Sequence, residues 1–245
     1  MNEKWNILKK WKKSCEVGDL QKTKETSVQG LFFSQIFNQV LGYRTLIDGG
    51  IYNQSPEFKS TLDGSEADGA LGYFNAAQNL RDVRVAIELK GASISLDKKQ
   101  HRTSHLTPVE QGMSYANKNG SKCGWVIVSN FMETRLYKSD SSLEYETFDI
   151  RKMDDKTEFL KFYFLLCKEH LLYGICFFFG RSVCYFLSDD KRTGGAKSFY
   201  NAYIFRIFLC IYYIIYRDKR FLAKFGICNN DIDSVCFVFR DNIGS

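Results

Sequence analysis

The stretch "EADGALGYFNAAQNLRDVRVAIELKGAS", residues 66–93, contains the clearest strand pattern of the chain. Residues 83–90 alternate in a way that predicts a strand, because side chains two positions apart point to the same side of a sheet. Glu88 and Lys90 would then share one face at a separation of roughly 6.5–7 Å. The opposite face would be apolar and would pack in the core, through Val83, Val85, Ile87 and Leu89.

A carboxylate and an ammonium held on one rigid sheet face suit the hydrolysis of a phosphodiester. Glu88 could bind a hard cation such as Mg²⁺, which keeps several of its waters. Lys90 could orient or help to deprotonate a metal-bound water, and could neutralise charge that develops on the phosphoryl group. An E-x-K pair on a strand is also common as a solvated pair, so the motif alone leaves both interpretations open.

The cation site needs a second carboxylate, and Asp68 is the candidate. It lies twenty residues before Glu88 in what the sequence predicts to be a glycine-rich turn. Gly69 and Gly72 would let the backbone bend there and let a bulky phosphate approach. An aspartate in such a turn is more often a turn former than a metal ligand, so Asp68 by itself is a weak signal.

The composition is that of a globular protein, with 44% hydrophobic and 25% charged residues in a chain of 245. A net charge of +6 suits a polyanionic partner without requiring one. The eight cysteines include no C-x-x-C pair, which argues against zinc-knuckle and redox sites. The first residues lack the apolar segment of a signal peptide, so we expect reduced cysteines and a cytoplasmic location.

Up to residue 172 the chain alternates between helical and β-rich patterns. This alternation predicts one α/β domain, residues 1–172, in which helices flank a mixed β-sheet and the site lies on one sheet edge. Helices are predicted at 2–14, 26–41, from Pro108 onward and at 155–172, and strands at 83–90, 124–130, 134–140 and 144–150.

Residues 173–245 have a different character, rich in aromatic residues and cysteine. We expect an apolar, helical tail with no membrane role. The apolar runs at 173–187 and 202–216 are interrupted by Arg181 and Arg206, whereas a membrane span needs about 20 apolar residues. Two membrane spans, or the remnant of a longer protein, are the alternative interpretations.

Several blocks in this order resemble the N-terminal nuclease domain of type IIG restriction–modification enzymes, within the PD-(D/E)xK nuclease superfamily. The resemblance covers about residues 20–170. In those single-chain enzymes a nuclease, an adenine methyltransferase and a target-recognition region follow one another. The blocks are "KETSVQGLFFSQIFNQVLGY" (24–43), "EADGALGYF" (66–74), "VAIELKGA" (85–92), "VEQGMSYANKNG" (109–120) and "WVIVSNFMETRLY" (125–137).

The resemblance implies a role for five residues. Asp68 and Glu88 would be Mg²⁺ ligands, and Lys90 would be the catalytic lysine. Gln111, on the helix after the strand, would support the phosphate or the attacking water. Glu25 matches an acidic position that can join the site.

The chain departs from the family pattern in two places. Ala67 stands where a proline usually precedes the first aspartate. After residue 172 there is neither a glycine-rich loop for S-adenosylmethionine nor an Asn-Pro-Pro-aromatic adenine pocket. We therefore expect a nuclease that lacks its methyltransferase and recognition regions.

The expected function is that of a Mg²⁺-dependent endonuclease acting on double-stranded DNA within a restriction–modification system. The basic run Lys98, Lys99 and Arg102 could hold DNA phosphates, although a solvated loop fits these residues equally well. The alternative is a restriction-like module that binds DNA or a protein partner and does not cut. A membrane-associated protein that uses the tail is a third possibility.

Overall fold

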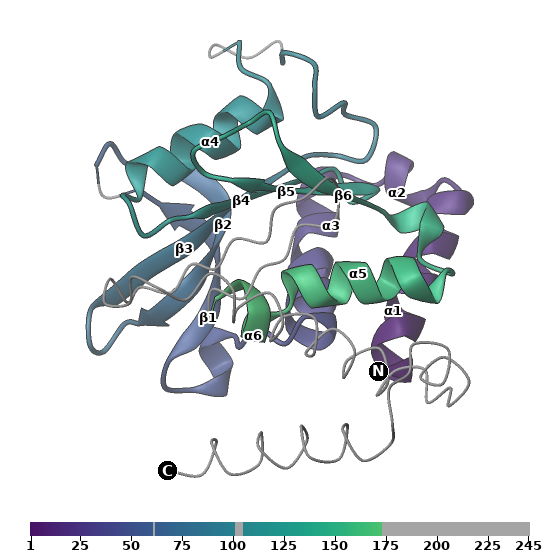
Figure 1. Cartoon of the computed structure of the whole chain (residues 1–245), viewed down its shortest axis with the longest axis horizontal. Coiled ribbons are helices and arrows are strands. Elements are labelled where there is room, and N and C mark those ends of the chain that lie inside the picture. The colour runs from purple at the N-terminus through teal and green to yellow at the C-terminus, as the bar shows by residue number, and fades with distance from the viewer. Residues whose placement is uncertain (61, 101–104, 173–245) are drawn as a thin grey trace, which may run out of the picture. The chain divides into compact units, whose positions relative to one another are not determined.

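The fold is built on a six-stranded sheet with the strand order β1-β2-β3-β4-β5-β6 (Figure 1). The computed structural model describes residues 1–60, 62–100 and 105–172. Strands β3 and β4 are parallel and all other neighbours are antiparallel, so the sheet is mixed. The strands are β1 (Tyr52–Lys59), β2 (Glu66–Asn75), β3 (Leu80–Leu89), β4 (Trp125–Ser129), β5 (Glu133–Lys138) and β6 (Tyr145–Asp149).

Helices cover both faces of this sheet (Figure 1). Helix α4 lies on one face, while α1, α3 and α5 lie on the other. The α/β class and the mixed sheet flanked by helices, both predicted from the sequence, are confirmed. The helical segments are α1 (Asn2–Glu16), α2 (Asp19–Lys22), α3 (Glu25–Leu31), the π-helix η1 (Phe32–Val40), α4 (Pro108–Lys118), α5 (Lys156–Leu166), α6 (Lys168–Leu171) and the 3₁₀ turns η2 (Leu46–Asp48) and η3 (Ile150–Lys152).

The segment predicted as one helix at 26–41 is an α-helix followed by a π-helix, α3 and η1. Its apolar stripe is buried as predicted, from Val28 through Phe32 and Ile36 to Val40. The wider winding of η1 also buries Phe33 and Phe37. Gly42 ends the segment with φ +83°, a conformation that favours glycine.

The prediction of a glycine-rich turn around Asp68 is wrong, because these residues form β2. The two glycines fit crowded positions of that strand. A Cβ atom on Gly69 would lie 2.3 Å from Cζ of Phe33, and one on Gly72 would lie 2.0 Å from the carbonyl oxygen of Asp82. Both glycines therefore serve close packing in the sheet.

Strand β3 has one face toward α4 and the other toward the helices on the far side, and it is buried on both. The predicted apolar face is partly wrong, because the β2–β3 register shifts between Leu71 and Gly72. The shift leaves Arg84 without a cross-strand partner, since Val85 pairs with Leu71 and Val83 with Gly72. Val83 consequently joins Ala86 in the core cluster that contains Ala116 of α4.

Within the described ranges, no helix is long and apolar enough to cross a membrane. The predicted helical tail, residues 173–245, lies outside the described residues together with its two apolar runs. The predicted domain boundary after residue 172 stays a prediction.

The contact between Gly69 and Phe33 gives a test of this packing. Gly69→Ala should lower the free energy of unfolding by about 1–3 kcal/mol, because the added methyl group overlaps a buried ring. Phe33→Leu should restore part of this loss when combined with Gly69→Ala. The matched control is Gly30→Ala on α3, where a Cβ meets nothing within 4 Å, so this helix position should be unchanged or more stable. Equal urea midpoints for the two alanine variants would contradict the packing.

Candidate active site

The strands β2 and β3 bring Asp68 and Glu88 together. Gly69 pairs with Ile87 and Ala70 with Ala86, so the next pair in this antiparallel register is Asp68 with Glu88. Directly opposed residues share a sheet face. Both strands are interior, since the edges of the sheet are β1 and β6. The predicted location on a sheet edge is therefore wrong, and the two carboxylates lie at the ends of interior strands.

Lys90 follows directly after β3 and lies between these carboxylates. Its Nζ atom donates a hydrogen bond to Oε1 of Glu88 and is 3.9 Å from Oδ2 of Asp68. Both members of the Lys90–Glu88 pair are buried, with residue exposures of 3% and 2%. The backbone N–H of Lys90 donates to the carbonyl oxygen of Ser129 (2.8 Å), which extends the pairing with β4 to this residue. The lysine is thus held rigidly by both its backbone and its side chain.

Asp68 is more accessible than Glu88 and Lys90, with 27% of its side chain exposed. Its Oδ2 atom accepts a hydrogen bond from the backbone N–H of Leu89 at 2.7 Å. Its carbonyl oxygen accepts one from the side-chain amide of Gln29 on α3 at 3.2 Å. Asp68 is therefore fixed in place although its side chain is partly exposed.

Glu25 joins the same end of the sheet from the first turn of α3. Its Oε2 atom accepts a hydrogen bond from the backbone N–H of Gly91 at 2.5 Å. The side chain also contributes to the negative field at Glu88. The structure thus brings Glu25, Asp68, Glu88 and Lys90 together around the end of β3.

The environment of Glu88 raises its pKa to about 7. Burial is the largest cause, and the negative charge of Asp68 and, to a smaller extent, of Glu25 acts in the same direction. Lys90 opposes them through its charge and its hydrogen bond. The carboxylates outnumber the one lysine, so an added cation would be favoured at this point.

Helix α4 approaches β3 closely, and Gln111 lies on that helix. Gly112 allows the approach, because a Cβ there would lie 2.8 Å from Cγ1 of Val126 and 3.6 Å from Cβ of Glu88. Gln111, half-buried, immediately precedes this contact. Its side chain forms no hydrogen bond to another described residue, so its predicted role in supporting phosphate or water stays a prediction.

The residues predicted to contact DNA lie in the connection between β3 and α4. Lys98 and Lys99 are exposed, and Arg102 falls outside the described residues. Binding of DNA phosphates by this segment stays a prediction.

The carboxylates of Asp68 and Glu88 have the donor chemistry that Mg²⁺ requires. No group of three or more His, Cys, Asp or Glu residues in the described part of the chain is arranged to hold a metal ion. Mg²⁺ does not need such a group, because one or two carboxylates commonly bind it together with waters and substrate phosphates. A buried carboxylate with a raised pKa beside a second carboxylate fits such a cation.

Three supporting residues were missed in the sequence. Gln29 lies four residues after Glu25 on α3, so the two side chains share a helix face and both reach this end of the sheet. Gly112 could have been suspected, because a glycine inside a predicted helix commonly marks close packing. The backbone carbonyl of Ser129 accepts the hydrogen bond from the backbone N–H of Lys90, and no side-chain pattern signals such a contact.

Comparison with known proteins gives little beyond the geometry. No family model matches the chain, and no curated protein matches it. Among solved structures it is similar to a chain of the cryo-EM structure of a DrdV–DNA complex, with 15% identity and a TM-score of 0.39. That match covers 65% of this chain and 96% of the other. A likeness this weak carries no argument about function.

The raised pKa of Glu88 predicts a pH-dependent effect of removing its charge in metal-free buffer. The folded state holds the proton of Glu88 more tightly than the unfolded state, where the pKa is 4.5. The stability gained from this proton is present below about pH 4.5 and is lost as the pH rises through about 7. Glu88→Gln mimics the protonated form, so its free energy of unfolding relative to the wild type should rise by about 1–3 kcal/mol between about pH 5 and pH 8.

The control for this measurement is Glu144→Gln, at an exposed position before β6. Urea denaturation of both variants at several pH values measures the effect. A Glu88→Gln difference that stays as flat with pH as the control would contradict the electrostatic description of the site.

Proposed function

We propose that this chain is a Mg²⁺-dependent endonuclease of the PD-(D/E)xK kind that hydrolyses phosphodiester bonds in DNA. The observation that carries the proposal is the grouping of Asp68, Glu88 and Lys90 at one end of two interior strands. Their order along the chain is that of the resembled family. Their convergence across a cross-strand pair is what the chemistry requires.

Each side chain then has a distinct role. Asp68 and Glu88 would hold Mg²⁺, which supplies Lewis acidity toward the phosphate and a more acidic bound water. Lys90 would orient the attacking water and neutralise charge that develops on the phosphoryl oxygens. Glu25 supports the site indirectly, by fixing the backbone N–H of Gly91.

The approach of substrate is consistent with the exposure of these residues. The side chain of Asp68 is partly exposed, whereas Glu88 and Lys90 are almost fully buried. A phosphate would therefore reach the site from the side of Asp68. Rigid, preorganised charges in a partly dry site stabilise a transition state better than the same charges in water.

We further propose that the chain is the nuclease part of a type IIG-like restriction–modification system. In the resembled enzymes a separate region reads the target sequence through base edges, whereas phosphate contacts only position the protein. On this proposal the chain alone should bind duplex DNA without sequence preference, and its cleavage should not depend on S-adenosylmethionine. Discrete fragments from a sequenced plasmid would contradict this part of the proposal.

The second candidate function is a restriction-like module that binds without cutting. The observation that favours it is the direct Lys90–Glu88 ion pair, because Glu88 is already paired with Lys90 before any cation binds. In a cutting enzyme the cation would compete with Lys90 for Glu88. The cleavage experiment below separates the two candidates.

Cleavage of supercoiled plasmid in Mg²⁺ at low ionic strength tests the proposed activity. Wild type should nick the plasmid slowly, and Glu88→Gln should reduce the rate by about 100-fold or more, because a neutral amide is a poor cation ligand. Lys90→Ala should have a similar effect. The control Glu144→Gln should cut like the wild type. Nicking by Glu88→Gln at the wild-type rate would overturn the site, and no nicking by wild type in Mg²⁺ or Mn²⁺ would favour the binding module.

A further inference from the structure

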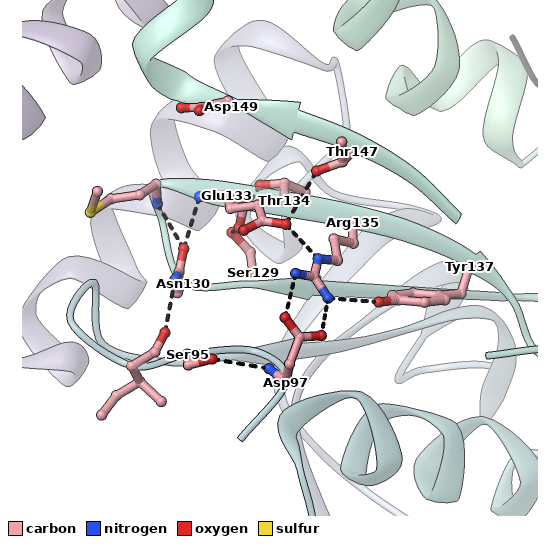
Figure 2. Close-up of polar contacts among 12 residues, drawn as sticks. Ser95, Asp97, Ser129, Asn130, Glu133, Thr134, Arg135, Tyr137, Thr147 and Asp149 are labelled. Carbon is pink, nitrogen blue, oxygen red and sulfur yellow. Dashed lines mark hydrogen bonds and ion pairs between the residues drawn. The ribbon is translucent and has the colours of Figure 1, made fainter. Parts of the chain in front are cut away.

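The segment that follows Lys90 is fastened to the rest of the domain at three points. Glu25 binds the backbone N–H of Gly91 at its start. The side-chain amide of Asn130 donates to the carbonyl oxygen of Ile94 at 2.8 Å. Arg135 of β5 holds Asp97 near its end (Figure 2). Residues 91–97 therefore follow a fixed course, although they form neither helix nor strand.

Arg135 and Asp97 form a bidentate ion pair, which we call the clamp. Nη1 of Arg135 donates to Oδ1 of Asp97 at 2.6 Å, and Nη2 donates to Oδ2 at 2.9 Å. Such a paired arrangement is both directional and stronger than a single hydrogen bond. Arg135 is buried and Asp97 is exposed: 8% of the Arg135 side chain is accessible to solvent, and 68% of the Asp97 side chain is. The arginine belongs to the body of the domain, and the segment attaches to it.

Neighbouring side chains hold the guanidinium in place. Nε of Arg135 donates to Oε1 of Glu133 at 2.5 Å, and Nη1 also donates to the hydroxyl of Tyr137 at 3.4 Å. The ring of Tyr145 lies 4.8 Å from the guanidinium carbon. Figure 2 shows Glu133 and Tyr137 of β5, and Asp97 of the segment, around the guanidinium of Arg135. The bond to Arg135 lowers the pKa of Asp97, so the pair stays charged at neutral pH.

The clamp lies close to the candidate active site. Glu88 pairs with Val128 of β4, and Val128 pairs with Arg135 of β5, so the three residues form one row across the sheet. Two strand spacings separate Glu88 from Arg135, which is about 10 Å. The clamp therefore fixes the segment beside the end of β3, on the sheet face that carries Glu88.

Two exposed lysines, Lys98 and Lys99, come directly after the clamped residue. The negative charge of Asp97 would by itself repel DNA phosphates. The bidentate bond to Arg135 explains why a carboxylate is nevertheless present beside the two lysines. Fixing the backbone at Asp97 limits the positions that both ammonium groups can take. Less conformational entropy is then lost when the lysines bind a polyanion.

We propose that Arg135 and Asp97 are positioning residues for nucleic-acid binding, and that they hold Lys98 and Lys99 where they contact DNA phosphates beside the scissile bond. The inference rests on the proposed function for its choice of DNA as the ligand. It assigns neither residue a chemical step.

The test uses Asp97→Ala in the full chain, because the exposed Asp97 can be changed without leaving a cavity. Its matched control is Asp154→Ala, which removes another exposed carboxylate that is paired with a lysine (Lys12, 2.8 Å). Both changes raise the formal net charge by one unit from +6. Electrostatics alone predicts that both variants bind DNA at least as tightly as the wild type.

If the clamp positions the lysines, removing Asp97 should instead weaken DNA binding. In fluorescence anisotropy with a labelled duplex, at low ionic strength and with EDTA, Asp97→Ala should bind about threefold to tenfold more weakly than the wild type. Asp154→Ala should bind as tightly or more tightly. Asp97→Glu keeps a carboxylate that can accept both guanidinium bonds, so it should recover most of the affinity.

A double-variant comparison shows whether Asp97 acts through the lysines. Lys98→Ala/Lys99→Ala should weaken binding and reduce its dependence on salt. Adding Asp97→Ala to that variant should cause no further loss, because the groups that the clamp positions are gone. A merely structural loss would instead persist in the combined variant.

The inference would be overturned by an Asp97→Ala variant that binds as tightly as Asp154→Ala, or by an additive loss in the combined variant. An absence of DNA binding by wild type would also overturn it. Failure of the proposed nuclease activity is distinguishable from these results, because a wild type that binds DNA in EDTA but does not cut it in Mg²⁺ leaves the clamp intact. Circular dichroism melting curves confirm that each variant is folded.

Discussion

The buried ion pair between Lys90 and Glu88 is the interaction on which the rest of the candidate site depends. A carboxylate that is removed from water and placed beside Asp68 is costly in its charged form, and this cost appears in the raised pKa of Glu88. One lysine offsets part of that cost but leaves an excess of negative charge, since Glu25 also lies nearby. A domain selected for stability alone would gain by replacing such a pair with apolar residues. We interpret the arrangement as one that a cation and a phosphate complete.

The surrounding scaffold brings backbone elements unusually close to this pair. Gly112 lets α4 approach Glu88 from one face, and Gly69 lets the ring of Phe33 pack against β2 from the other. Backbone hydrogen bonds to Asp68 and Glu25 hold the two outer carboxylates. The side chains that would carry the chemistry are therefore attached to the least mobile kind of structure, interior strands and a closely packed helix.

The sequence predicts much of this arrangement where the signal is local. Alternation around Glu88 and Lys90 identifies β3, and the Thr107–Glu110 capping box with Pro108 at the first turn explains why α4 begins where predicted. Strand spacing predicts that Glu88 and Lys90 share a face, and the need for a second carboxylate points to Asp68, whereas Glu25 is expected only through the family resemblance. Their assigned roles as metal ligands and catalytic groups remain proposals.

The sequence fails where packing overrides local preference. The glycines beside Asp68 have the composition of a turn, yet they lie in β2. These strand positions are glycine because larger side chains would collide with Phe33 and with the backbone at Asp82. The register shift at Arg84 moves Val83 to the other face, which no alternation pattern shows. The contact between Arg135 and Asp97 joins residues 38 positions apart, so only the folded chain places them together.

The central claim, that the carboxylates at the end of β3 form a divalent-cation site, can be tested directly by paramagnetic NMR. Substoichiometric Mn²⁺ added to the isotopically labelled full chain broadens amide signals close to the bound ion. The account predicts that the amides of Asp68 and of residues 88–91 lose intensity first, and that Glu88→Gln removes this effect. Broadening centred on an exposed acidic position such as Asp154, with the signals around Glu88 unchanged, would contradict it.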